Sequence, residues 1–132
     1  MLFIYNDKII LEDKSEIDNI VYISDQAFWE CTGLTSLTIP GSVTSIGYHA
    51  FAYCNGLISV TIENGVKSIG GGAFFFCDPS YVSIPPSITS IGGDAFVPNI
   101  DNRSNMEALY IQDIRSLYEI DFGDESSSNP FR

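Results

Sequence analysis

Three cysteines stand at equal intervals in this chain: Cys54 follows Cys31 by 23 residues, and Cys77 follows Cys54 by the same distance. The residues between them repeat as well. Thr32–Cys54 reads TGLTSLTIPGSVTSIGYHAFAYC, and Asn55–Cys77 reads NGLISVTIENGVKSIGGGAFFFC. This repeat constrains the fold more than any other feature, because a unit of this length cannot bury an apolar face alone and has to stack on its neighbours.

The repeat becomes less regular toward both ends of the chain. In chain order the segments are a degenerate capping repeat at 1–31, coils at 32–54, 55–77 and 78–99, and a degenerate repeat with a tail at 100–132. The third coil is one residue shorter than the others, and Pro79 replaces its first leucine. Atypical terminal repeats are what a stack of coils needs at its ends. We therefore expect residues 1–132 to form a single repeat domain.

Each coil begins with the pattern of a strand. In Leu34–Ile39 the apolar residues finish in alternation with Ser36 and Thr38, and alternation of period 2 indicates a strand with one buried face. Pro40 and Gly41 should end that strand. The segments expected beside it, in one parallel sheet, are Leu57–Ile62, Val82–Ile84 and Leu109–Ile111.

The return side of each coil is predicted to carry aromatic residues of the core. Gly47 is expected to let the backbone turn sharply before Ala50 and Phe51, and small Ala50 should admit close packing. The phenylalanines expected to stack inside the coils are Phe28, Phe51, Phe74 and Phe96. The apolar positions before the first coil include Ile20, Ile23, Ala27 and Cys31. Before all of these, Leu2–Leu11 is predicted to form a hairpin that caps the stack.

The period and the pattern L-x-x-L-x-I are the signature of a leucine-rich-repeat solenoid. The unit closely resembles that of the BspA-like leucine-rich repeat family, L-x-x-L-x-I-P-x-x-V-x-x-I-G-x-x-A-F-x-x-C. Leu34–Cys54 matches every fixed position, and the next coil departs only at Val60 and Glu63. The predicted fold class is thus a repeat solenoid, a right-handed coil with a short parallel sheet on the concave face and turns or short helical segments on the convex side.

The resemblance also implies a function and a location. Members of that family are bacterial and protozoan surface proteins, mostly regarded as adhesion or host-interaction modules. It implies an extracellular or cell-surface protein that binds another protein, such as a component of the host extracellular matrix. The alternative is a structural spacer in a longer repeat array, with no ligand of its own. No signal peptide is visible, because Met1–Tyr5 is apolar for too short a stretch.

Charge and hydropathy exclude two classes of partner. The net charge is −11 and the isoelectric point is near 4.1. Nucleic-acid binding needs clustered Lys and Arg, and the six basic residues here are scattered. No uninterrupted apolar stretch approaches the ~18 residues of a membrane-spanning helix. We expect neither nucleic-acid binding nor membrane insertion.

The cysteines allow several interpretations. Stacked in neighbouring coils, their Cα atoms would lie about 5 Å apart, which is within disulfide range. However, the side chains would point inward in parallel, and three equivalent thiols cannot all pair. A zinc site needs about four converging ligands, and the only histidine, His49, lies on a different turn. We expect reduced, buried thiols and no metal or other cofactor.

No catalytic arrangement accompanies the repeat. His49 is expected to be an exposed residue of the convex turn, and it has no nucleophile in an elbow motif to act on. The run Gly70–Gly72 lacks the lysine of a phosphate-binding loop, and Asp121 with Asp124 and Glu125 does not match a calcium loop. These residues predict a protein that is not an enzyme.

The strand face turned away from the core is the predicted binding surface. Two lateral rows follow from the alignment of the coils: Ser36, Ser59, Tyr81 and Ala108, and Thr38, Thr61, Ser83 and Tyr110. Solenoids present such rows as a continuous concave surface. Tyr81 and Tyr110 are the candidate hot spots, because tyrosine is enriched there. An aromatic row on the return side, Trp29, Tyr53 and Phe76, is either packing between coils or a second binding stripe.

Overall fold

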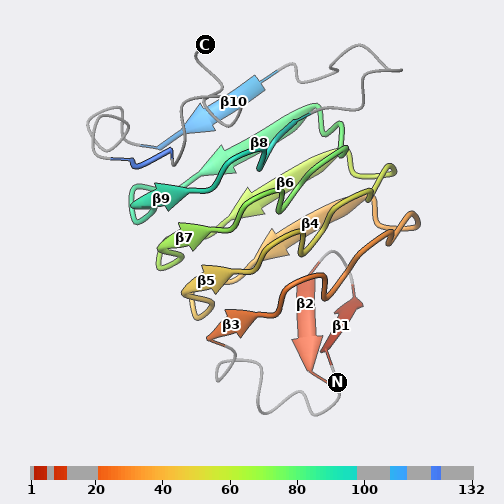
Figure 1. Ribbon diagram of the computed structural model, residues 1–132. Helices are drawn as coiled ribbons and strands as arrows, with labels where there is room; N and C mark the ends of the chain where they lie inside the picture. Colours follow the sequence, from red (N-terminus) through yellow and green to blue (C-terminus); the bar gives the residue numbers. More distant parts are fainter. Residues whose placement is uncertain (1, 6–7, 12–20, 98–107, 113–119, 123–132) are drawn as a thin grey trace.

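The computed structural model describes residues 2–5, 8–11, 21–97, 108–112 and 120–122, and the strands in these ranges form two sheets. The larger sheet has the order β1 (Leu2–Tyr5), β2 (Lys8–Leu11), β4 (Ser36–Ile39), β6 (Ser59–Ile62), β8 (Tyr81–Ile84) and β10 (Ala108–Ile111). The smaller sheet has the order β3 (Tyr22–Ile23), β5 (Ser45–Ile46), β7 (Ser68–Ile69) and β9 (Ser90–Ile91). Figure 1 shows the coils stacked along one axis, each giving one strand to each sheet.

The predicted parallel sheet is confirmed. Strands β4, β6, β8 and β10 pair in parallel in that order, so that Leu37 lies beside Val60 and Val60 beside Val82. The strands begin two residues later than predicted in the two regular coils. The reason is that the first leucine closes a turn, since the Leu34 N–H donates to the Cys31 carbonyl at 3.2 Å. Leu34 still packs against the core.

The predicted hairpin is confirmed as well. Strands β1 and β2 pair antiparallel, from Leu2 opposite Leu11 to Tyr5 opposite Lys8. Strand β2 then pairs in parallel with β4 through Lys8 and Thr38. The hairpin therefore extends the larger sheet beyond the first regular coil.

The smaller sheet was not predicted. Its strands are only two residues long, which is too short for a period to show in the sequence. They form because stacked coils bring equivalent backbone groups together, with Ser45 beside Ser68 and Ser68 beside Ser90. The pairing therefore depends on the stack and not on strand propensity.

Turns complete the return side of each coil, and the described ranges contain no helix. Alternate N–H groups in these turns bond to the next coil: that of Phe51 donates to the Ala73 carbonyl at 2.8 Å, and that of Tyr53 to the Phe75 carbonyl at 2.8 Å. The intervening Ala52 N–H donates within its own coil. A helix is not compatible with this arrangement, because it would keep all these groups for itself.

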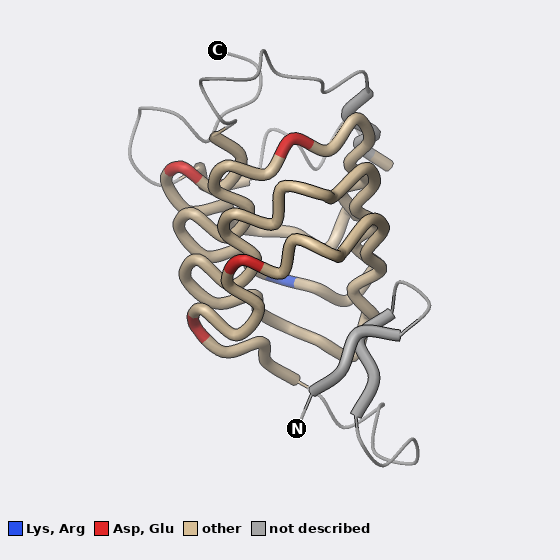
Figure 2. The backbone as a smooth tube through the Cα atoms, turned by 90° about the vertical axis from the view of Figure 1, so that its right-hand side faces the viewer, with Lys and Arg blue, Asp and Glu red and all other residues tan. Residues whose placement is uncertain are grey.

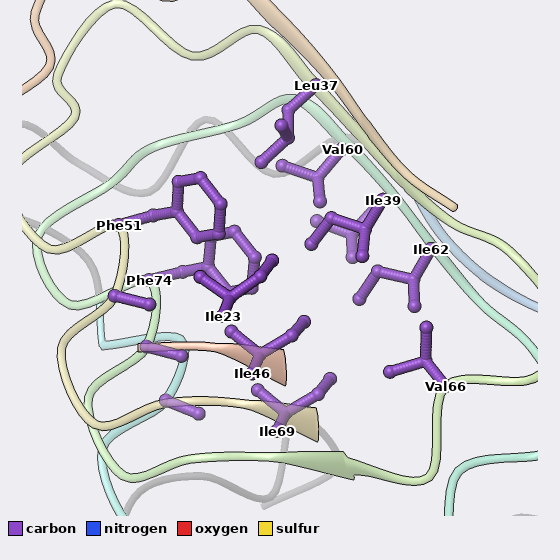
Figure 3. Packing of buried hydrophobic residues seen from close by; sticks show 14 of the residues in the cluster. Ile23, Leu37, Ile39, Ile46, Phe51, Val60, Ile62, Val66, Ile69 and Phe74 are labelled. Atoms are coloured by element: carbon purple, nitrogen blue, oxygen red, sulfur yellow. The ribbon is translucent and has the colours of Figure 1, made fainter. Parts of the chain in front are cut away.

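The core lies between the two sheets and the turns (Figure 3). Phe51 and Phe74 are fully buried and point into this space, toward isoleucines of both sheets. The predicted phenylalanine stack is confirmed. Its ring centroids follow at 5.1, 5.3 and 5.3 Å with nearly parallel planes, in the order Phe28, Phe51, Phe74 and Phe96.

Gly47 has a different role from the one predicted. It shows no left-handed backbone that would demand a glycine. The requirement is instead one of space. A Cβ atom at Gly47 would lie 2.6 Å from the Asp25 nitrogen, and one at Gly70 would lie 2.7 Å from the Gly47 carbonyl carbon. Neighbouring coils thus touch backbone to backbone along this line of glycines.

The ends of the stack differ from the middle. Ile23 is buried as predicted, whereas Ala27 is exposed because it lies in the first of the described coils. At the other end, the Asp121 N–H donates to the Thr89 carbonyl at 2.9 Å, and the Ile91 N–H donates to the Asp121 carbonyl at 2.7 Å. Part of the tail therefore extends the smaller sheet, which was not predicted. Ile20, Asp124 and Glu125 lie outside the described residues.

Candidate functional site

The two lateral rows predicted for the concave face lie in register. Ser36 pairs with Ser59, Ser59 with Tyr81 and Tyr81 with Ala108. The second row is built in the same way from Thr38, Thr61, Ser83 and Tyr110. Parallel strands without a bulge carry each repeat position into the same row, so the register follows directly from the period of the sequence.

The alternation that builds these rows also makes them accessible. Ser36, Thr38, Ser59 and Thr61 are half-buried, while Leu37 and Val60 between them are buried in the core. Tyr81 is likewise half-buried. Part of the polar capacity is used within the row, because the Ser59 hydroxyl donates to the Ser36 hydroxyl oxygen at 3.0 Å.

Ser83 does not take part in an open surface, contrary to the sequence interpretation. Its residue is only 5% exposed. Its hydroxyl oxygen accepts a hydrogen bond of 3.3 Å from the Gln112 side-chain amide, which comes from the segment after β10. Nothing in the repeat pattern indicated that a side chain 29 positions away would reach Ser83. The candidate face is therefore centred on Ser36, Thr38, Ser59, Thr61 and Tyr81, and the register places Tyr110 beside it.

The cysteines form an internal ladder. All three are free thiols, Cys54 and Cys77 buried and Cys31 partly exposed. The Cys54 thiol donates to the Phe28 carbonyl at 3.2 Å, and the Cys77 thiol donates to the Phe51 carbonyl at 2.9 Å. Cys54 and Cys77 therefore each connect their coil to the preceding one, a role that explains a small side chain with a weak donor at this position.

We expect the thiols to react with alkylating reagents in a defined order. Only the thiolate reacts, and burial raises the pKa of the Cys31 thiol, while a hydrogen bond with Cys54 and burial together raise that of Cys77. The same hydrogen bond lowers the pKa of Cys54, so the protection of this thiol comes from its complete burial. Cys31 should be labelled first, because it is the least buried. Cys54 and Cys77 should be labelled only on unfolding. Mass spectrometry after timed alkylation measures this order, and equally fast labelling of all three would contradict the ladder.

His49 was expected to be an exposed turn residue, and the structure shows it half-buried among aromatic rings. Its ring stacks on Tyr48 at 4.0 Å and on Phe75 at 5.6 Å. In the part of the chain that the structure describes, no three His, Cys, Asp or Glu residues come together as a metal site would require. The same described ranges contain no helix long and apolar enough to cross a membrane.

The aromatic row on the return side exists, with a corrected register. Counting by the 23-residue period, Trp29 is equivalent to Ala52 and Phe75, and not to Tyr53 and Phe76. It nevertheless contacts the next coil diagonally, because its ring centroid lies 5.0 Å from that of Tyr53. Tyr53 in turn lies 5.3 Å from Phe76. These contacts indicate that Tyr53 and Phe76, the half-buried members of the row, pack between coils.

A comparison with protein families decides the identity of the repeat. The model of a BspA type leucine-rich repeat region, with six copies, matches residues 10–123. The chain belongs to the BspA-type leucine-rich repeat family. Leucine-rich repeat domains generally bind proteins, proteins of this BspA type are generally secreted or at the surface, and the fold is typically not enzymatic.

A solved structure supports the leucine-rich-repeat fold. The chain is similar to a leucine-rich repeat protein from Bacteroides ovatus, with a TM-score of 0.59 and 26% sequence identity. The match covers 70% of this chain and 28% of the Bacteroides ovatus chain, so this BspA-type repeat chain spans less than a third of that protein. No curated protein matches.

Proposed function

We propose that this protein is a non-enzymatic adhesion module, displayed at a cell surface, that binds another protein through its concave strand face. The single observation that carries the proposal is the register of β4, β6 and β8, which sets half-exposed Ser and Thr side chains in continuous rows that end at Tyr81. Such rows form the extended surface on which partners of solenoid proteins dock. Membership of the family supports the same class of function.

The residues proposed to contact the partner are the predicted site residues other than buried Ser83, namely Ser36, Thr38, Ser59, Thr61, Tyr81 and Tyr110. The short hydroxyl side chains offer adaptable hydrogen bonds, and tyrosine supplies a large contact area for little loss of conformational entropy. The proposed partner class is host extracellular-matrix protein, which the family resemblance suggests. The 132 residues are proposed to act as one domain.

We expect the paired change Tyr81→Ala and Tyr110→Ala to weaken binding well over tenfold, because truncating one hot-spot tyrosine typically costs about 2 kcal/mol or more. The measurement is an affinity determination against purified host extracellular-matrix proteins, one at a time. A matched control is Val21→Thr, which changes a side chain that is 60% exposed just before the smaller sheet to the residue that the next coil has at Thr44, and it should leave the affinity unchanged.

The other candidate function is that of a structural spacer. It is favoured by the hydrogen bond between Ser59 and Ser36, which satisfies polar groups within the row and leaves fewer for a partner. If every matrix protein fails to bind the wild-type chain, the spacer is the better account. If a protein binds and the tyrosine pair has no effect, the concave face is not the site.

A further inference from the structure

Aromatic side chains gather on the turns of the return side, away from the concave sheet. Six residues form one connected set of ring contacts, with centroids 4.0 to 5.8 Å apart. We call this set the turn-side cluster; its members are Trp29, Tyr48, His49, Tyr53, Phe75 and Phe76. Trp29 and Tyr48 are its most open members, with exposures of 37% and 53%.

A carboxylate is fixed at the edge of the turn-side cluster. One oxygen of Asp25, Oδ1, accepts a hydrogen bond of 2.8 Å from the Tyr48 N–H and one of 3.0 Å from the Tyr22 hydroxyl. The bond to Asp25 raises the pKa of the Tyr22 hydroxyl, so this tyrosine stays neutral and keeps its donor. Tyr22 is 46% exposed. A negative charge is thus held between two exposed tyrosines.

The solenoid does not require these aromatic residues. In register, Tyr22 lies beside Ser45 of the next coil, and Ser68 and Ser90 occupy the same position further along. By the same period, Ala52 stands where the preceding coil has Trp29, and Gly71 stands where the preceding coil has Tyr48. The next coil therefore has small residues at the positions of Tyr22, Trp29 and Tyr48, although Phe75 returns an aromatic ring to the Trp29 position one coil later. Packing between coils explains Tyr53, Phe76 and the side of Trp29 that lies against Tyr53, but not the exposed parts of Tyr22, Trp29 and Tyr48.

The charges on the stacked coils indicate the chemistry of a partner. Among residues 21–97 the basic residue is Lys67 alone, and the acidic residues are Asp25, Glu30, Glu63, Asp78 and Asp94. Figure 2 shows the few charges on the stacked coils, most of them acidic. Aromatic faces carry a negative quadrupole and attract a Lys or Arg cation placed within about 6 Å of the ring centroid. A carboxylate beside such rings adds a full negative charge, which attracts the same cation.

We propose that the turn-side cluster, together with Tyr22 and Asp25, is a second docking surface that binds a cationic, Lys- or Arg-rich segment of another protein. The Asp25 carboxylate pairs with the cation, and the rings of Tyr22, Tyr48 and Trp29 provide the faces over which cationic side chains lie. The surface lies on the smaller sheet and the return-side turns, so it is separate from the concave rows.

The first test uses a short acetylated peptide of alternating arginine and glycine, and the same peptide with citrulline in place of arginine. The arginine peptide should bind in isothermal titration calorimetry and change the emission of Trp29, which is the only tryptophan. Its affinity should fall at least about tenfold between low and high salt, because exposed charges are screened. The citrulline peptide should not bind measurably. Equal binding of the two peptides, or no binding of the arginine peptide, overturns the proposal.

The second test changes the surface to residues that other coils already carry, namely Tyr22→Ser, Trp29→Ala and Tyr48→Gly in one variant. Calorimetry should show at least about a tenfold loss of affinity for the arginine peptide, with an unchanged circular dichroism spectrum. Asp25→Asn should also weaken binding. If the triple variant does not fold, Tyr22→Ser alone has to show a weaker but measurable loss.

Two control variants make the second test specific. Ile58→Thr removes a side chain that is 60% exposed from another part of the surface and installs the residue that the preceding coil has at Thr35. The paired Tyr81→Ala and Tyr110→Ala change alters the concave face only. Both should bind the arginine peptide like the wild-type chain. A loss in either control, or retained affinity in the triple variant, would contradict a site on the turns.

Discussion

Phe51→Ala is expected to destabilise the protein by about 3–5 kcal/mol, because it removes a fully buried ring from the middle of the core stack. The ring lies 5.1 Å from Phe28 and 5.3 Å from Phe74, so both neighbouring coils lose contacts. A loss of this size is a large part of the total stability of a small protein. Urea unfolding followed by circular dichroism measures it.

Phe96→Ala provides the matched control for that experiment. Phe96 belongs to the same stack but is only partly buried and contacts a single phenylalanine of it. Phe96→Ala should therefore reduce the free energy of unfolding clearly less than Phe51→Ala, since the cost of a truncation scales with the apolar surface that is lost and the cavity that is left. Equal effects of the two changes, or a loss below about 1 kcal/mol for Phe51→Ala, would show that the stack is not the main support of the coils.

Gly70→Ala is expected to cost about 3 kcal/mol, although it adds only one methyl group. The new Cβ would lie 2.7 Å from the Gly47 carbonyl carbon and 2.8 Å from the Ile46 oxygen. Both are backbone atoms that cannot rotate away. The coils would have to separate, which would stretch the hydrogen bond of 2.8 Å from the Gly70 N–H to the Ile46 carbonyl. Thermal unfolding compared with the wild type measures the loss.

Gly33→Ala is the control for this change, because nothing lies within 4 Å of a Cβ at that position. It should leave stability within about 0.5 kcal/mol of the wild type or raise it slightly, since alanine restricts the unfolded chain. A similar loss for both glycines would mean that backbone freedom, and not the close approach of the coils, explains their presence.

Part of the candidate site followed directly from the sequence. The concave rows are a consequence of alternation within each strand and of a constant period between strands, so Ser36, Ser59 and Tyr81 had to fall in one line. The burial of Ser83 did not follow, because Gln112 belongs to a degenerate repeat whose path no period predicts. Asp25 was missed for a similar reason, since it accepts its hydrogen bond from the Tyr48 N–H, which belongs to the neighbouring coil.

The repeat determined the order of the parallel strands, the phenylalanine stack and the inward thiols, because each is a periodic property that a single coil shows and its neighbours copy. Only the tertiary structure decided the smaller sheet, the choice of turns over short helical segments on the return side, and the role of Gly47. These features depend on the distance between backbones of adjacent coils, which lets Phe51 donate to Ala73 and leaves no room for a Cβ at Gly70. A sequence records which side chains a coil carries, but the contact between two coils exists only once they are stacked.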